Sequence, residues 1–312
     1  EKIMGETEFQ NLIQKAKTFA KKKEFYKFAR NITLAENLAK TDKEKQELYL
    51  AEISGLMKNN SYKDALEAVR KTDNMFDDPI FKMNVLMKKG VIFGHLEKFD
   101  RALETLNYIA KSDFPEKKAR AHINIIWIYE LLYLDDSKEE YLDKAEESCN
   151  KVLELLETCE LSDRNYNIFL TNLGCLYYRQ EKYEKSLEVF MELKDKLVDE
   201  GNYAITHNNI ASVLVEENRI KEAKEYLHKA LLKAEQLKDY NEIAENYMVE
   251  AEIAMIDEDY NRVRDNYVVA YDYFVKAKNL QKACMVLKDI QSVDFRVNNE
   301  SLDKLSRQLK NA

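Results

Sequence analysis

The chain has 312 residues, of which only 6 are Gly and 2 are Pro, whereas average usage would supply roughly 22 Gly and 16 Pro. This scarcity excludes sandwiches and barrels of many short strands, and also nucleotide-binding folds with Gly-rich phosphate loops. A net charge of −8 lacks the basic excess of a nucleic-acid-binding domain. We therefore predict an all-α chain, long enough to need several domains or a repeat array.

We expect neither a membrane span nor a secretory leader. The most apolar stretch, residues 123–134, is short and contains Asn124 and Glu130, and residues 1–23 have no apolar core. The 4 cysteines show no C-x-x-C spacing and are too few for a disulfide framework. These features predict a cytoplasmic protein. The 4 His residues are scattered, which predicts no metal site, and nothing in the sequence calls for a cofactor.

In chain order, residues 6–40 are expected to form an opening helix pair that is strongly basic. Its cations are Lys15, Lys17, Lys21, Lys22, Lys23, Lys27 and Arg30. They mark either a linker to a DNA-binding domain or a charged end cap. Because the sequence begins at Glu1 rather than Met, we expect that a segment precedes it. We divide the chain into the opening segment 1–43, a repeat region 44–278 and capping helices 279–312.

A short pattern recurs through the repeat region, in which an aromatic or aliphatic residue stands three positions before a small residue or Val. Its copies are Tyr62-x-x-Ala65, Phe99-x-x-Ala102, Leu142-x-x-Ala145, Tyr183-x-x-Ser186, Ile220-x-x-Ala223 and Tyr260-x-x-Val263, with a weaker one at Tyr26-x-x-Ala29. The six main copies are 37, 43, 41, 37 and 40 residues apart. Twelve residues upstream of four of them stand the small residues Gly90, Gly174, Ala211 and Ala251. We infer that the two helices of a unit cross where these small residues meet, and that stacked units share one continuous core.

The register predicts the helices themselves. First helices are expected near 44–58, 79–95, 115–134, 163–180, 203–217 and 240–257, and second helices near 61–74, 98–111, 139–160, 182–198, 220–237 and 260–277. Pro79 and Pro115 stand at the starts of two first helices, where proline is tolerated. The extra length of the unit containing Trp127 falls at residues 133–140, and a closing helix pair is expected at 279–311.

The segment Asn172-Leu-Gly-Cys-Leu-Tyr177, followed by Tyr183-Glu-Lys-Ser-Leu-Glu-Val-Phe190, resembles the tetratricopeptide (TPR) repeat. The resemblance extends over roughly residues 24–278, although the units are longer than the usual 34 residues of that family. It implies a right-handed superhelix of about seven helix pairs with a capping helix pair at its C-terminal end. First helices then line the concave face.

One stripe of each first helix is left open on that face, and it carries an Asn at the same register in three successive units. These residues are Asn124, Asn172 and Asn209. Asn is a mediocre helix former, and its amide can both donate to and accept from the backbone of an extended peptide. Comparable Asn ladders occur in peptide-binding TPR proteins, which supports a peptide ligand. The alternative is that each Asn caps or bridges helices without a ligand.

Other polar residues of the stripe suggest how a ligand would be held. Arg120 and Arg179 can bind a carboxylate through paired hydrogen bonds, or they form ordinary surface ion pairs. Trp127 is either an apolar anchor or a core aromatic residue. The remaining candidates for peptide binding are Asn84, Lys88, Thr171 and Asn208. No nucleophile with an adjacent base is apparent, so we expect a binding protein rather than an enzyme.

Among long-repeat TPR proteins the chain resembles the peptide-responsive regulators of Gram-positive bacteria, the Rap, NprR and PlcR group, through the run Thr206-His-Asn-Asn-Ile-Ala211 and the long units. The resemblance implies quorum sensing: a short peptide binds inside the superhelix and controls transcription or a partner protein. No helix-turn-helix is present, so DNA would be bound through a preceding domain. The alternatives are a TPR scaffold that binds an extended protein segment and a Rap-like phosphatase using Gln10 or Gln14. A homodimer is compatible with each.

Overall fold

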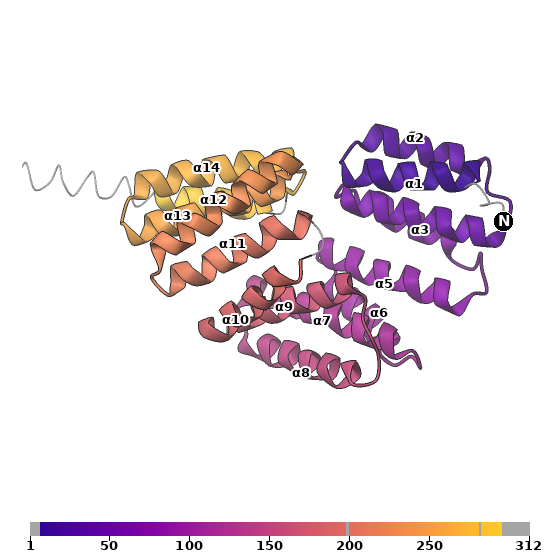
Figure 1. Ribbon diagram of the computed structural model, residues 1–312, viewed down its shortest axis with the longest axis horizontal. Helices are drawn as coiled ribbons and strands as arrows, with labels where there is room; N and C mark the ends of the chain where they lie inside the picture. The colour runs from indigo at the N-terminus through magenta and orange to yellow at the C-terminus, as the bar shows by residue number, and fades with distance from the viewer. Residues whose placement is uncertain (1–6, 198–199, 281, 295–312) are drawn as a thin grey trace, which may run out of the picture. The chain divides into compact units, whose positions relative to one another are not determined.

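The computed structural model describes residues 7–197, 200–280 and 282–294, and these residues form helices and turns with no β-strand (Figure 1). The predicted all-α fold is confirmed. The helices are α1 (Glu8–Lys21), α2 (Phe25–Glu36), α3 (Asp42–Lys58), α4 (Tyr62–Thr72), α5 (Pro79–His95), α6 (Phe99–Ala110), α7 (Pro115–Asp136), α8 (Glu139–Leu156), α9 (Asp163–Arg179), α10 (Tyr183–Asp195), α11 (Glu200–Glu216), α12 (Ile220–Leu237), α13 (Tyr240–Ile256) and α14 (Tyr260–Lys276). A further helical stretch covers residues 282–294.

Local sequence explains where the helices begin. Thr7 and Thr41 each form a capping box, in which the threonine hydroxyl accepts from the third backbone N–H and that residue's side chain accepts from the threonine N–H. The carboxylate of Asp78 caps α5, and Pro79 and Pro115 occupy the first positions of α5 and α7, as the sequence predicts. Proline lacks a backbone N–H, and none is needed there.

The turns within the helix pairs do not require glycine. Two residues before each second helix, a non-glycine residue adopts a left-handed backbone conformation with φ between 55° and 57°. These residues are Lys23, Asn60, Glu97, Ser137, Glu181, Asn218 and Glu258. No glycine among the described residues has a positive φ. Glycine therefore serves this chain in helix packing rather than in turns.

The helix crossings lie where the repeat register places them. A side-chain carbon added to Gly90 would stand 2.8 Å from the Leu106 side chain, and one added to Gly174 would stand 2.6 Å from the Phe190 ring. The Ser186 hydroxyl donates to the Gly174 carbonyl oxygen at 2.8 Å. The small residues are thus required because a large side chain of the second helix, one turn beyond the crossing, packs directly on the first helix.

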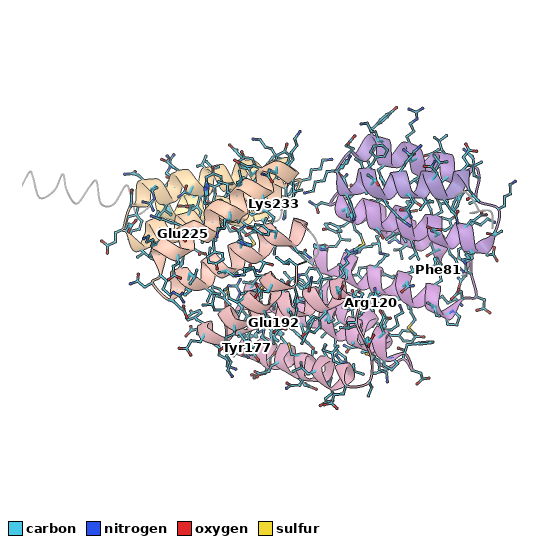
Figure 2. The ribbon with its side chains drawn as sticks, in the orientation of Figure 1. Phe81, Arg120, Tyr177, Glu192, Glu225 and Lys233 are labelled. Atoms are coloured by element: carbon cyan, nitrogen blue, oxygen red, sulfur yellow. The ribbon has the colours of Figure 1, made fainter. Side chains whose placement is uncertain are left out.

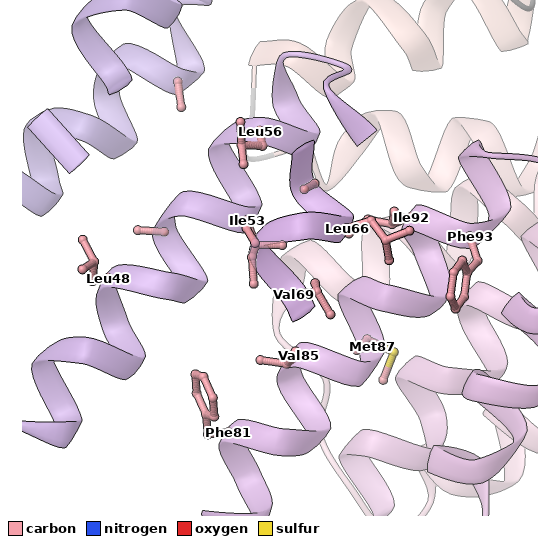
Figure 3. Close-up of a cluster of buried hydrophobic side chains, with 14 of the residues drawn as sticks. Leu48, Ile53, Leu56, Leu66, Val69, Phe81, Val85, Met87, Ile92 and Phe93 are labelled. Carbon is pink, nitrogen blue, oxygen red and sulfur yellow. The ribbon is translucent and has the colours of Figure 1, made fainter. Parts of the chain in front are cut away.

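The helices group into two compact units, residues 1–165 and residues 166–312. In unit 1, α1, α2 and α3 pack against one another (Figure 1), and a core that includes Leu48, Ile53, Val69 and Phe81 runs on through α5 (Figure 3). In unit 2, Val263, Tyr267 and Phe274 of α14 pack on Ala251 and other residues of α13. The domain boundaries at 43/44 and 278/279 stay a prediction.

Two segments need comparison with the helices predicted from the sequence. The extra length at residues 133–140 does not form an irregular insertion: α7 continues to Asp136, Ser137 ends it with a φ of 57°, and α8 begins at Glu139. Of the closing pair expected at 279–311, the part beyond residue 294 lies outside the described residues. No helix in the described part of the chain is long and apolar enough to cross a membrane.

Candidate functional site

Unit 1 contains a pocket of about 850 Å³ formed mainly by the first helices of its pairs, with Tyr62 of α4, within the usual size range of ligand sites. Its polar lining is strongly biased towards positive charge. Seven cationic residues, Lys17, Lys21, Lys43, Lys58, Lys88, Arg120 and Arg164, face only two acidic ones, Glu47 and Asp78. Arg120 stands on α7, and Phe81 on α5 supplies part of the apolar lining (Figure 2). The pocket reverses the sign of the chain's overall charge.

Two of these cations stand deeper than the others. Lys88 and Arg120 are half-buried, whereas Lys17, Lys21, Lys43, Lys58 and Arg164 are exposed at the rim. The Lys88 ammonium donates to the Ser54 hydroxyl at 2.7 Å, and that hydroxyl in turn donates to the Leu50 carbonyl oxygen at 2.6 Å. Burial, reinforced by the charges of Arg120, Arg164 and Lys58, lowers the pKa of Lys88 to about 8. Lys88 therefore stays mostly protonated at neutral pH.

The acidic residues at and beside the pocket already have partners within the protein, and Asp78 accepts from the backbone N–H groups of Ile80 and Phe81. Glu47 forms an ion pair with Lys17 at 3.0 Å. Glu116 accepts from both Arg120 and Lys117, each at 3.1 Å. Burial opposes the charge on Glu116, but the hydrogen bond from Lys117 and the charge of Arg120 still hold its pKa below the usual value. Within the described residues, neither Lys88 nor Arg164 has an acidic partner.

One wall of the pocket is aromatic. The Tyr62 ring stacks on the His95 ring with centroids 4.1 Å apart, and His95 contacts Trp127 at 4.8 Å. Burial raises the pKa of Tyr62 to about 12, so its hydroxyl remains neutral and donates to the Asn60 side chain. Trp127 is half-buried, packs against Gly94 and lies outside the pocket lining. Its position matches the core aromatic interpretation more closely than the anchor interpretation.

Three predicted site residues of unit 1 lie in the pocket, and two, Trp127 and Asn124, lie outside its lining. Asn84, Lys88 and Arg120 all line the pocket, and the Asn84 side-chain oxygen accepts from Lys117 at 2.9 Å. Asn124 lies outside the lining. Its amide donates to the Arg120 carbonyl oxygen at 2.9 Å and contacts the Met87 sulfur at 3.2 Å. In this unit Asn124 thus bridges α7 and α5, as its alternative interpretation supposes.

In unit 2 the predicted asparagines have unequal surroundings. Asn172 is 8% exposed and Asn209 is half-buried. Asn208 is 4% exposed, and its amide hydrogen-bonds with Glu242 and Asn246 of α13. Its surroundings are those of a helix-bridging residue. The Thr171 hydroxyl donates to the backbone of its own helix at 2.9 Å.

Arg179 of unit 2 lies among carboxylates rather than in a cationic pocket. Its guanidinium lies 5.3 Å from the Tyr178 ring, and the Tyr178 hydroxyl donates to Glu216 at 3.1 Å. Burial and the charge of Glu216 raise the pKa of Glu252 to about 7, against the opposing charge of Arg179. Burial likewise raises the pKa of Glu242 to about 8. The carboxyl group of Glu252 thus lies within electrostatic range of Arg179.

Several pocket residues are absent from the sequence-based candidates, namely Lys17, Lys21, Lys43, Lys58 and Arg164. Lys17 and Lys21 belong to the basic opening pair, and their spacing of four residues places them on one face of α1. In the sequence, this spacing of two lysines on one helix face is the signal that could have indicated a cationic pocket. The described residues contain no group of three or more His, Cys, Asp or Glu side chains that could hold a metal ion.

Comparison with known proteins identifies a known repeat in two segments of unit 2. A model of the tetratricopeptide repeat matches residues 169–195 and 204–232. No curated protein matches the sequence significantly. Among solved structures, a Rap protein complexed with Competence and Sporulation Factor is 11% identical with a TM-score of 0.59, covering 95% of this chain and 90% of that one.

Two further solved structures have the same arrangement of helices. Aspartyl phosphate phosphatase F from Bacillus subtilis is 14% identical with a TM-score of 0.51, covering 94% of this chain and 85% of that one. The anaphase-complex assembly Cut9–Hcn1 is 15% identical with a TM-score of 0.58, covering 89% of this chain but 48% of that one. At such identities these similarities establish the fold alone.

Proposed function

We propose that this chain, two segments of which match the tetratricopeptide repeat, is a regulator that binds a short peptide or an extended protein segment in the pocket of unit 1. The observation that carries the proposal is the pocket itself. Its lining comes from the first helices of successive pairs and combines half-buried cations with an aromatic wall. An extended chain offers backbone amides for Asn84 and side chains for the cations and the aromatic rings.

The proposal includes what the resemblance to peptide-responsive regulators implies about location, target and assembly. The protein acts in the cytoplasm, and ligand binding controls transcription or a partner protein, as in quorum sensing. DNA would be reached through a domain that precedes this chain, and two copies would associate as a homodimer. One solved neighbour is itself a complex with Competence and Sporulation Factor, which supports a ligand-responsive regulator over a passive scaffold.

The phosphatase alternative draws on the neighbour named aspartyl phosphate phosphatase F. It requires an exposed amide on the opening helices. The Gln10 side chain accepts from the Thr7 backbone N–H at 3.1 Å as part of the capping box, whereas Gln14 is exposed on α1. The cap occupies one of the two amides, so this alternative rests on Gln14 alone.

Peptide binding is tested on the full chain with pools of capped hexapeptides. We expect at least one pool to raise the melting temperature in proportion to its concentration, because a ligand that binds only the folded state stabilises it. Fluorescence anisotropy with a labelled pool should show saturable binding, weakened by Asn84→Ala. If no pool of any composition binds, the proposed function is wrong.

A further inference from the structure

We propose that the pocket of unit 1 selects acidic segments, with Lys88 as the central anion-binding residue and Arg120 beside it. This inference rests on the proposed function and names the chemistry of its ligand. The ligand is a peptide segment that carries several carboxylates along an extended backbone and includes an apolar residue.

The first step is the distribution of charge. A chain with a net charge of −8 places seven cations around one pocket that contains two acidic residues. Like charges gathered in a pocket repel one another and raise its local potential. Surface lysines that serve solubility alone are interspersed with acids on the same face. Glu47 and Glu116 offset the charges of Lys17 and Arg120. The excess of positive charge that is left is electrostatically unfavourable in the empty pocket, and an anionic ligand relieves it.

The second step concerns the orientation of Lys88. The Ser54 hydroxyl accepts from Lys88 and gives its own hydrogen to the Leu50 carbonyl oxygen. An ammonium group has three donors, and Ser54 is the only hydrogen-bond partner of Lys88 among the described residues. Two donors are therefore left for a ligand. A buried cation without an anionic partner is costly, and such a residue is easiest to explain as one half of an ion pair that the ligand completes.

The third step distinguishes a peptide from a small inorganic anion. The cations come from five helices, α1, α3, α5, α7 and the start of α9, and the pocket of about 850 Å³ is much larger than a single inorganic anion. Its lining also includes the apolar residues Leu50, Ile80 and Phe81, and Ile80 is 54% exposed. A single phosphate would use only some of the cations and none of this apolar surface. A peptide with carboxylates and an apolar side chain uses both.

The experiment uses the full chain and three labelled hexapeptide pools with blocked termini. All pools carry the same apolar residues at alternate positions, and the other positions hold Asp and Glu, their amides Asn and Gln, or Lys and Arg. We expect the acidic pool to bind at least about tenfold more tightly than the amide pool, since charge-assisted hydrogen bonds replace neutral ones. The advantage should shrink when NaCl is raised from about 50 mM to about 300 mM.

Substitutions locate the site. Lys88→Met keeps the unbranched side chain and removes the charge, and Arg120→Gln removes the second cation. Each should weaken binding of the acidic pool about tenfold, in line with loss of a charge-assisted contact, and leave the amide pool unchanged. Matched controls are Lys89→Met, the next residue of α5 and outside the pocket lining, and Arg70→Gln on α4, which pairs with Glu67.

A stability measurement separates ligand binding from a structural role. Lys88→Met should melt no lower than the unsubstituted chain, because it removes a poorly solvated cation. A merely structural lysine would lower both the melting temperature and the affinity. Equal binding of the acidic and amide pools, or acidic binding unaffected by Lys88→Met, would overturn the inference while leaving peptide binding intact. Inorganic phosphate binding as tightly as the acidic pool would overturn the peptide assignment, and failure of every pool would overturn the proposed function as well.

Discussion

From the charge of Lys88 we predict how the free energy of unfolding depends on pH. Its pKa is about 8 in the folded chain and about 10.4 when unfolded. Between these values the unfolded chain holds more protons than the folded one, so Lys88 makes the free energy of unfolding rise with pH. Well below pH 8, Lys88 is charged in both states, and the full cost of burying its charge lowers the free energy of unfolding. A shift of 2 to 3 pH units corresponds to about 3 kcal/mol as an upper bound, and partial exposure reduces this to about 1–2 kcal/mol.

The assay compares urea unfolding of the unsubstituted chain and Lys88→Met at pH 7 and pH 9.5. At pH 7 the variant should be more stable by about 1–2 kcal/mol. At pH 9.5 somewhat more than half of that difference should be lost, and the rest should disappear only above the unfolded pKa of about 10.4. Taking the difference between the two proteins cancels the titration of all other groups, including Lys58, Arg120 and Arg164, which face Lys88. Parallel pH profiles for the two proteins would refute the reasoning.

Three further predictions concern packing, turns and thiols. Gly174→Ala should destabilise unit 2 by about 1–2 kcal/mol, because overpacking against the buried Phe190 outweighs the better helix propensity of Ala. Urea unfolding measures this loss. Adding Phe190→Leu to the variant should restore part of it. Glu181→Gly should stabilise by about 0.5–1 kcal/mol by relieving a left-handed backbone with φ of 57°, whereas a melting temperature that falls would contradict the turn geometry. Iodoacetamide followed by mass spectrometry should label exposed Cys284 in the native chain and reach Cys149 only after unfolding, since Cys149 is buried and burial raises its thiol pKa.

The helices could be predicted because their determinants are local or strictly periodic. Capping residues such as Thr41 and prolines such as Pro79 mark helix starts through contacts within one turn. The crossings at Gly90 and Gly174 follow from a fixed spacing within each pair. The left-handed residue Glu97 has no such signal, because any residue type can occupy that turn at a modest cost.

The pocket could be predicted only in part. The inner stripe contained Lys88 and Arg120, which the helical period places on the open face. Lys43 and Arg164 were missed because they come from helices far apart in the sequence and meet at the pocket only through the stacking of the pairs. Asn124 shows the opposite case: the helical period assigns it to the same stripe, but its contact with Met87 depends on how closely α5 and α7 approach. Spacing along the chain carries no information about that distance.

The choice of lysine at position 88 leads to a last prediction. An acidic ligand needs Lys88 protonated, so affinity should fall as pH rises through about 8. If bound carboxylates restore the ordinary lysine pKa, the acidic pool should bind about tenfold more weakly at pH 9 than at pH 7. In Lys88→Arg the guanidinium stays charged throughout this range, so the affinity ratio between the two pH values should be close to one. Comparing ratios within each protein removes differences in side-chain size. A tenfold loss that persists in Lys88→Arg would assign the titration to another group, and Lys88 would then no longer be the central anion-binding residue.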